Sequence, residues 1–304
     1  MESVFSLMLR IVIMISIGVI LKKANIITKE LQKGISDVLL KAILPLSIIS
    51  STEAAFSKDT FQGITATCIF AGGYYILSLA GITLLSKRLS VSVEKRKVFI
   101  TMCVFANTGF IGFPVAEEVF GTSAMLYAVL YNLFYQIFFF TYGIQILDKE
   151  SGMNIMKVFQ TPVTIASMLS IIKFIFQIHF PEPVQAAFTS VGNMTVPLSM
   201  IIIGCTIVEM KCSEIVKDFY SYLVSLFRLI IFPVIAFGIF KVIGDSSMTA
   251  KLCILLTALP SGSLNVIVAE QKNCEPEFAA RTVVQNMIFM LITLPFIIGL
   301  LKFL

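Results

Sequence analysis

Two short stretches place polar side chains beside helix-breaking residues in apolar surroundings. The first is ANTGFIGFP, residues 106–114, and the second is ALPSGSLNV, residues 258–266. Glycine and proline interrupt a helix, and each interruption creates a helix N-terminus whose free N–H groups and positive dipole end can hold an anion. The amides and hydroxyls nearby can add hydrogen bonds. The chemistry that these stretches predict is therefore the binding of a carboxylate without a buried arginine or lysine.

The candidate substrate-binding residues lie at and beside the two interruptions. Polar side chains would bond the substrate, whereas glycines and prolines would open the backbone. Gly and Pro kinks are common in membrane helices, and small residues also permit close packing. Packing is thus the alternative role for each kink, although two matching polar kinks favour binding. The set is Asn107, Thr108, Gly109, Pro114, Pro260, Ser261, Gly262, Ser263 and Asn265.

The two stretches repeat each other at about half the chain length. NTGFIGFPVAEE, residues 107–118, aligns with PSGSLNVIVAEQ, residues 260–271, at an offset of 153. PLSII, residues 45–49, aligns with PLSMI, residues 197–201, at an offset of 152. Two matches at nearly one offset predict an internal duplication. The first repeat would cover residues 1–150 and the second residues 151–304.

The elements that must position these stretches have the composition of membrane-spanning helices. The chain is 57% hydrophobic and 13% charged, whereas a soluble domain has roughly 25% charged residues. Its apolar residues come in blocks of about 20, the length that crosses a bilayer. A soluble helical core is the alternative. We predict an all-α polytopic membrane protein with ten spans, at about 4–21, 34–52, 61–86, 97–119, 122–147, 162–180, 184–208, 219–243, 250–271 and 279–303.

Five spans in each repeat predict an inverted topology. With an odd number of spans, the second repeat enters the membrane from the opposite side, as in many secondary transporters. The interrupted spans are the fourth and the ninth, and paired interruptions in corresponding positions indicate a binding site. Broken backbone at membrane depth persists only where protein or a wet cavity surrounds it. We therefore expect the two interruptions to cross.

Basic residues indicate which side of the membrane each loop faces. They concentrate in the loops after the first and third spans, and on the same side at Lys149, Lys157, Lys211, Lys217, Lys272 and Arg281. The opposite side has little more than Lys58, Lys241, Lys251 and Lys302. By the positive-inside rule the basic side is cytoplasmic. In the plasma (inner) membrane both termini would then be extracellular or periplasmic.

Further candidates surround the expected crossing. The fifth span offers Tyr131 and Asn132 but has no acidic residue. This argues against sodium or proton exchange and fits a neutral, hydrogen-bonding cavity. Ser47 is added because the PLS kinks would shape a wall that faces the crossing. Glu117 and Glu270 occupy equivalent repeat positions, either as solvated helix ends or as gate or proton-handling carboxylates.

Four cations fall inside the predicted spans, where a charge is by default a functional hypothesis. The alternative is that their long side chains reach an interface. Arg10 and Lys173 are the stronger candidates for this second role. The other two cations are Lys41 and Arg228.

Several other classes of function lack their residues. The six cysteines form no CxxC pair, and the single histidine, His179, has no metal-ligand partner in sequence. We predict no metal, no cofactor and no nucleic-acid partner. An intramembrane enzyme would need a nucleophile and a base, and PSGS at 260–263 is the only serine motif that suggests one. No catalytic residue is predicted.

The same residues resemble the auxin efflux carrier family, which includes plant PIN-type exporters and bacterial malate and malonate carriers. The resemblance rests on ANTGFIGFP, ALPSGSLNVIVAEQ and LITLPF at 291–296. It implies a fold like sodium/proton antiporters and bile-acid transporters. Spans 1, 2, 6 and 7 would form a scaffold, usually dimeric, and spans 3–5 and 8–10 a moving transport domain. Asn107 matches the family's crossover asparagine, whereas SGSLN departs from the plant pattern.

The predicted function is that of a secondary transporter. It would move a small organic anion, such as a dicarboxylate or an auxin-like acid, by alternating access. The partners would be this substrate, the bilayer and a second copy in a homodimer. A sensor, receptor or passive channel on the same fold is the alternative.

Overall fold

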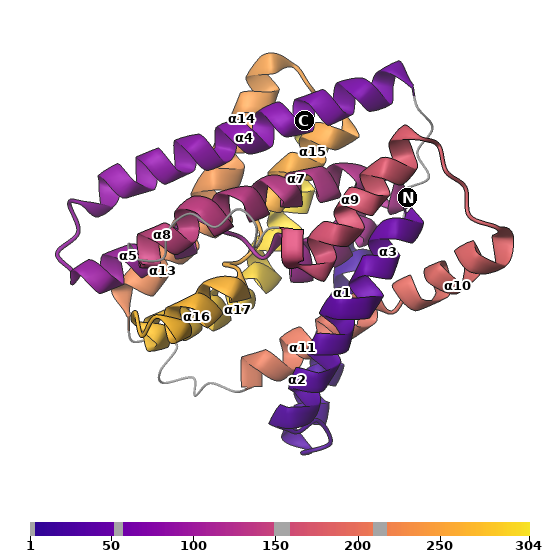
Figure 1. The fold of residues 1–304 in the computed structure, drawn as a ribbon. Helices are drawn as coiled ribbons and strands as arrows, with labels where there is room; N and C mark the ends of the chain where they lie inside the picture. Colours follow the sequence, from indigo (N-terminus) through magenta and orange to yellow (C-terminus); the bar gives the residue numbers. More distant parts are fainter. Residues whose placement is uncertain (1–3, 52–56, 149–158, 209–217) are drawn as a thin grey trace.

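The structure is a computed structural model, and it describes residues 4–51, 57–148, 159–208 and 218–304 (Figure 1). Within these ranges the secondary structure is helical, apart from one isolated bridge between two residues, which confirms the predicted all-α class. Some residues used above lie outside the described residues: Lys149, Lys157, Lys211, Cys212 and Lys217.

Six helical segments of the described chain are long and apolar enough to cross a membrane. They are Lys29–Ser51, Lys58–Ser86, Thr122–Leu147, Glu182–Val208, Phe219–Ile243 and Pro276–Phe303. Two shorter apolar helices are Pro162–Ile175 and Met248–Thr257. Segments of this length can span the hydrocarbon core of a bilayer. Their helical hydrogen bonds pair the backbone N–H and C=O groups, which have no water partners there. The chain is therefore a polytopic helical membrane protein.

The first half of the chain begins with the 20-residue helix α1 and contains the long helix α4. Short π-helical turns interrupt several helices. The elements are α1 (Val4–Lys23), α2 (Lys29–Val38), η1 (Leu39–Ile43), α3 (Leu44–Ser51), α4 (Lys58–Ser86), α5 (Val93–Val104), η2 (Thr108–Gly112), α6 (Phe113–Phe120), η3 (Thr122–Ala124), α7 (Met125–Phe138), η4 (Phe139–Gly143) and α8 (Ile144–Leu147).

The described residues of the second half are likewise helical. They are α9 (Pro162–Ile175), α10 (Glu182–Gly192), α11 (Thr195–Val208), α13 (Phe219–Leu226), η6 (Phe227–Ile231), α14 (Phe232–Ile243), α15 (Met248–Thr257), α16 (Ser263–Gln271), α17 (Pro276–Leu300) and η7 (Leu301–Phe303).

Short polar side chains fix where many helices begin. Each accepts a hydrogen bond from a backbone amide of the first turn, which would otherwise have no partner. These N-caps are Thr28, Ser57, Ser92, Thr161, Asp218 and Ser247. The polar residues between apolar blocks therefore act locally, as helix starts.

One predicted span boundary needs correction. The helix predicted over 162–180 ends at Ile175, and Gln177 follows it in the left-handed region with φ 49°. The span predicted over 184–208 agrees with the apolar segment Glu182–Val208, but its helix divides between α10 and α11. Pro197 has no N–H to donate to the Asn193 carbonyl, so a continuous helix would lose a hydrogen bond there.

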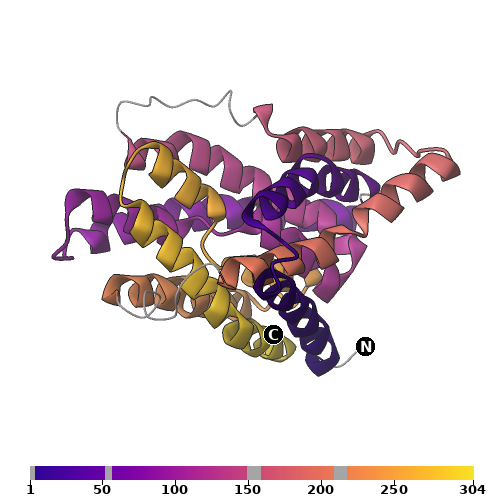
Figure 2. The same cartoon turned by 90° about the horizontal axis from the view of Figure 1, so that it is seen from below.

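The helices gather into two groups (Figure 1). The first contains α1 to α3 and α9 to α11, in which α1 packs on α11 and α3 packs on both α9 and α10. The second contains α4 to α8 and α13 to α17, in which α4 packs on α7 and α13 packs on α17. The groups meet where α9 contacts α7 and where α1 and α11 contact α17, and Figure 2 shows α1 beside the C-terminal helix.

Candidate functional site

The two interruptions predicted from the sequence lie against each other. Residues 105–107 separate α5 from η2, and residues 258–262 separate α15 from α16. Asn107 N donates to Pro260 O over 2.8 Å, and Gly262 N donates to Phe105 O over 2.9 Å. Ala106 and Ser261 form the isolated antiparallel bridge between them. Each break thus pairs backbone groups that the other break leaves without a helical partner.

The second interruption is two residues longer than the first. Phe105 and Ala258, which end α5 and α15, are 153 residues apart, the offset of the sequence repeat. Asn107 and Gly262, which precede the next helices, are 155 apart (262 − 107). Asn107 and Gly262 are therefore the structural counterparts at the helix N-termini, whereas the aligned sequences place Pro260 opposite Asn107.

Asn107 connects the two helix N-termini that face the crossing. Its Oδ1 accepts from Phe110 N at 3.1 Å, so it caps the first of these N-termini. Its Nδ2 donates to the hydroxyl of Ser263, the first residue of α16, at 3.2 Å. Gly262 lets the chains approach, because a Cβ there would lie 3.0 Å from Ala106 O.

Two buried amides at this site have an unused polar atom. Asn132 is 2% exposed, and its Oδ1 accepts from the Thr108 hydroxyl at 2.8 Å, but its Nδ2 has no hydrogen-bond partner among the described residues. Asn265 donates to Phe105 O and Gly262 O, each at 3.0 Å, and its Oδ1 is likewise without a described partner. An unpaired buried polar atom costs about 1–3 kcal/mol. A bound molecule with hydrogen-bonding groups would remove that cost.

Ser261 has a different environment from Ser263. Its hydroxyl donates to Met102 O at 2.7 Å and accepts from Asn286 Nδ2 at 2.7 Å. Asn286 Oδ1 in turn accepts from the hydroxyl of Ser225. Ser261 is therefore committed to a buried network that joins α13, α17 and the interruption, whereas Ser263 is exposed. Neither Asn286 nor Ser225 lies in a motif or a repeat match that could have identified it from the sequence.

Arg228, one of the four cations predicted inside the spans, lies at the crossing, where the sequence did not place it. It is fully buried in η6, and its guanidinium reaches both interrupted segments. Arg228 Nε donates to Leu259 O at 2.9 Å, and Nη1 donates to Val104 O at 2.9 Å and Cys103 O at 3.1 Å. A buried arginine therefore lies beside the crossing, and its donors bind backbone carbonyls of both interrupted segments. Helix register was the missing information, since the sequence did not show that Arg228 faces inward.

The remaining candidates lie at varied distances from the interruptions. A Cβ at Gly109 would lie 3.9 Å from Asn132 Oδ1, an ordinary van der Waals contact. Tyr131 packs against Tyr75 with ring centroids 5.9 Å apart, and Pro114 is buried in α6. Ser47 lies on α3, in the other helix group, where its backbone packs against α10 at Gly192.

Neither predicted gate carboxylate, Glu117 or Glu270, belongs to an ion pair found among the described residues. Glu117 is half-buried at the end of α6, and Glu270 is exposed on α16. The neighbouring Glu118 is the one with a cationic partner. Its Oε1 lies 2.8 Å from Arg10 Nη2, which places an ion pair between α6 and α1.

The other two intramembrane cations have partners away from the crossing. Lys41 pairs with Asp37 one turn earlier at 3.2 Å, and both side chains are exposed. Lys173 Nζ donates to Ile49 O at 3.2 Å near the C-terminal end of α3. Neither contact reaches the interruptions.

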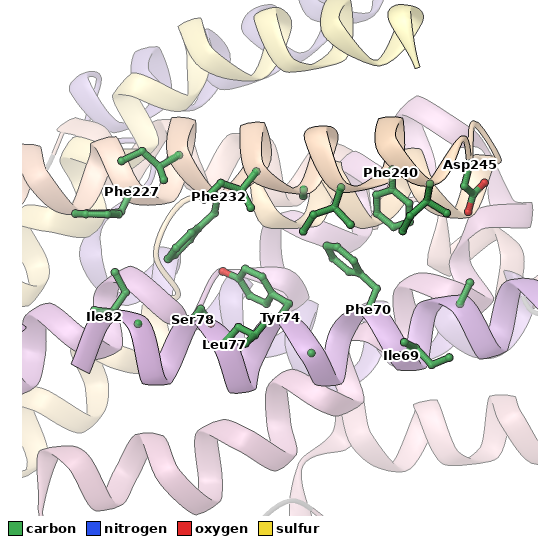
Figure 3. A pocket seen from close by; sticks show the side chains of 18 of the residues that line it. Ile69, Phe70, Tyr74, Leu77, Ser78, Ile82, Phe227, Phe232, Phe240 and Asp245 are labelled. Carbon is green, nitrogen blue, oxygen red and sulfur yellow. The ribbon is translucent and has the colours of Figure 1, made fainter. Parts of the chain in front are cut away.

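An apolar groove of about 710 Å³ lies between α4 and α14 (Figure 3). Figure 3 shows Phe70 and Tyr74 of α4 facing Phe232 and Phe240. Its lining is largely hydrocarbon, and Asp245 lies at one end. A carboxylate would find few donors here, so the groove is a poor anion site compared with the interruptions.

In the described part of the chain, no group of three or more His, Cys, Asp or Glu residues is arranged to hold a metal ion.

Comparison with known proteins places this architecture among transporters. A family model described as "Membrane transport protein" matches residues 3–156 and 148–298. An uncharacterised transporter of Methanothermobacter thermautotrophicus is 25% identical over 296 residues, 94% of this chain and 95% of the relative. An uncharacterised transporter of Methanocaldococcus jannaschii is 24% identical, over 93% of this chain and 94% of the relative. The chain therefore belongs to the membrane transport protein family, the family of the PIN-like auxin efflux carriers.

Proposed function

We propose that the protein is a secondary transporter of small organic anions, with the substrate carboxylate bound at the paired helix N-termini. The observation that carries this proposal is the buried donor Asn132 Nδ2, which has no described partner. The Oδ1 of the same side chain accepts from Thr108, the first residue of η2. The η2–α6 and α16 N-termini, joined through Asn107 and Ser263, add their free amides and positive dipole ends. All these groups favour an acceptor with negative charge.

The proposed architecture is ten spans in two inverted repeats of five. The bridge between the interruptions supports it, because Asn107 N to Pro260 O and Gly262 N to Phe105 O are reciprocal bonds of the kind a two-fold relation creates. The repeats, 1–150 and 151–304, each contribute one interrupted helix. A carrier with this plan binds its substrate between the repeats near the bilayer midplane.

Alternating access would come from movement between the two helix groups. The group of α1 to α3 and α9 to α11 would be the scaffold, and the group that contains both interruptions would move. Buried polar contacts within the second group, such as those of Arg228 and Asn286, support its moving as one body. The Arg10–Glu118 ion pair is a contact between groups that such a movement would break.

The orientation of the protein in the plasma membrane is also proposed, with both termini outside. Ion pairs connect the loops that are predicted to be cytoplasmic. Asp218 pairs with Lys95 and, at 3.6 Å, with Arg281. Lys272 pairs with Asp148 at 2.7 Å. Cysteine labelling at exposed Ser92 in a cysteine-free protein tests the sidedness. Labelling of intact cells by an impermeant reagent at position 92 would contradict it.

A homodimer through the scaffold is proposed as well, and the mass of the detergent-solubilised protein tests it.

The binding test uses carboxylates and their carboxamides as matched pairs. Each pair has one shape but differs in charge, and thermal stabilisation of the purified protein is measured. We expect some acids to raise the free energy of unfolding by RT ln(1 + [L]/Kd). The matched amides should leave it unchanged. Equal stabilisation by acid and amide, or none by any acid, would contradict an anion site.

A further inference from the structure

Arg228 is a buried cation that binds four backbone carbonyls and one tyrosine hydroxyl. It lies in the π-helical turn η6, within an apolar segment that could cross the membrane, and its side chain is fully buried. The ion pairs found among the described residues do not include it. A charge buried in this way is costly unless hydrogen bonds compensate it.

The carbonyls that Arg228 binds belong to the ends of two helices from different repeats. Cys103 O and Val104 O are in the last turn of α5. Leu256 O, 3.4 Å from Nη2, is in the last turn of α15, and Leu259 O follows that turn. The last carbonyls of a helix have no intrahelical donor. One guanidinium therefore supplies donors to both helix ends.

Two further contacts hold the guanidinium plane. Arg228 Nη1 donates to the hydroxyl of Tyr74 on α4, and the guanidinium carbon lies 5.8 Å from the Tyr74 ring centre. The Phe232 ring is 6.0 Å away on the groove side. At the repeat offset of 153 the counterpart of Arg228 is Tyr75 (228 − 153), which is buried and uncharged. A single arginine thus serves both interruptions.

The charges at the crossing decide what this arginine does. Each helix C-terminus carries about −0.5 of an elementary charge and each N-terminus about +0.5. Two C-terminal ends and two N-terminal ends at one place would cancel. The guanidinium offsets the C-terminal pair, so that the N-terminal pair remains as about one positive charge.

We infer that Arg228 is a positioning and specificity-determining residue, which holds both C-terminal helix ends and gives the anion site its net positive charge without touching the substrate. The inference rests on the proposed function in that the charged site is the one assigned to substrate. Its test needs no substrate, so its failure and that of the proposed function can be told apart.

The test reads the charge of the site directly. In a cysteine-free protein, Ser263→Cys places a thiol at the exposed first residue of α16. Its reaction rates with a sulfonate-bearing and a trimethylammonium-bearing methanethiosulfonate are measured, and their ratio reports the local potential. Ser57→Cys, an exposed N-cap of α4, is the matched control at another helix start.

The expected size follows from the geometry. Arg228 binds Leu259, and the four residues from there to Ser263 reach at most about 14 Å. At an effective dielectric constant of about 20, a unit charge about 15 Å away changes the ratio of anionic to cationic rates by on the order of tenfold or more. Arg228→Gln should lower the ratio at position 263 by that factor and leave position 57 unchanged. Arg228→Lys keeps the charge and Tyr74→Phe keeps the arginine, so both should keep the ratio.

Two results would overturn the inference. One is an unchanged ratio in folded Arg228→Gln protein. The other needs no change at Arg228, since the parent ratio at position 263 should exceed that at position 57. If the anionic-to-cationic rate ratio of the parent protein is lower at position 263 than at position 57, the site has no net positive charge. That result would overturn the inference even if Arg228→Gln does not fold.

Discussion

Asn107→Asp separates the structural role of this residue from its role in binding. An aspartate is as good an N-cap as an asparagine, so the bond from Phe110 N to the side chain is kept. What changes is the other end of the side chain, which donates to Ser263 at 3.2 Å and becomes a negatively charged acceptor. The Ser263 hydroxyl can rotate to donate in return.

The two effects differ in size. We expect the free energy of unfolding to change by less than about 1 kcal/mol, the worth of a typical hydrogen bond. A substrate carboxylate about 5 Å from the new charge would be repelled by about 3 kcal/mol at an effective dielectric constant of about 20, which lowers affinity by roughly a hundredfold. Asn107→Ala, in contrast, loses both the cap and the donor and should lower stability by about 1–3 kcal/mol.

The assay is thermal unfolding of the purified variants with a carboxylate that stabilises the parent protein. Asn107→Asp should unfold within a few degrees of the parent when no ligand is present and should show no stabilisation by the acid. Asn107→Ser keeps a capping oxygen without the charge and is the control. If folded Asn107→Asp binds the acid as tightly as the parent, the carboxylate does not lie at the paired N-termini.

Three further substitutions test separate contacts. Thr108→Val leaves Asn132 without its described donor and should lower the free energy of unfolding by about 1–3 kcal/mol, as measured by denaturation, whereas Thr108→Ser should not. Glu118→Gln removes the pair with Arg10, which is 48% exposed, so stability should change by less than about 1 kcal/mol; spin labels on α1 and α6 should nevertheless report longer distances. Gly204→Ala would place a Cβ 2.1 Å from a backbone oxygen of α1 and should prevent stable packing of α11 on α1, which a loss of monodisperse protein in detergent would show.

The parts of the site that could be predicted from the sequence are those with a local signal. Asn107, Gly262 and Ser263 are polar or helix-breaking residues in apolar blocks, and the structure brings these three together. Their close approach follows from the need of broken backbone for partners, a rule that needs no coordinates. Thr108 and Asn132 were both candidates, but their contact depends on how the fourth and fifth spans pack.

The rest depends on helix register and packing, which the sequence does not contain. Arg228 could equally have reached an interface, and only the fold shows that it binds two helix ends. Ser261 and Ser263 look alike in sequence, yet a network through Asn286 buries the first. The second interruption has two additional residues, so direct alignment of the repeats mismatches the N-caps. Ser47 belongs to a matched motif but packs against α10.

Counterflow in proteoliposomes tests the central claim most directly. Vesicles that contain the purified protein are loaded with an excess of an unlabelled carboxylate that stabilises it, and uptake of the same labelled acid is followed. A carrier with an anion site at the paired N-termini predicts transient accumulation of label above equilibrium by the parent protein and none by Asn107→Asp. Equal accumulation by both proteins would contradict the site. Label that only equilibrates in parent vesicles, without an overshoot, would contradict transport by alternating access.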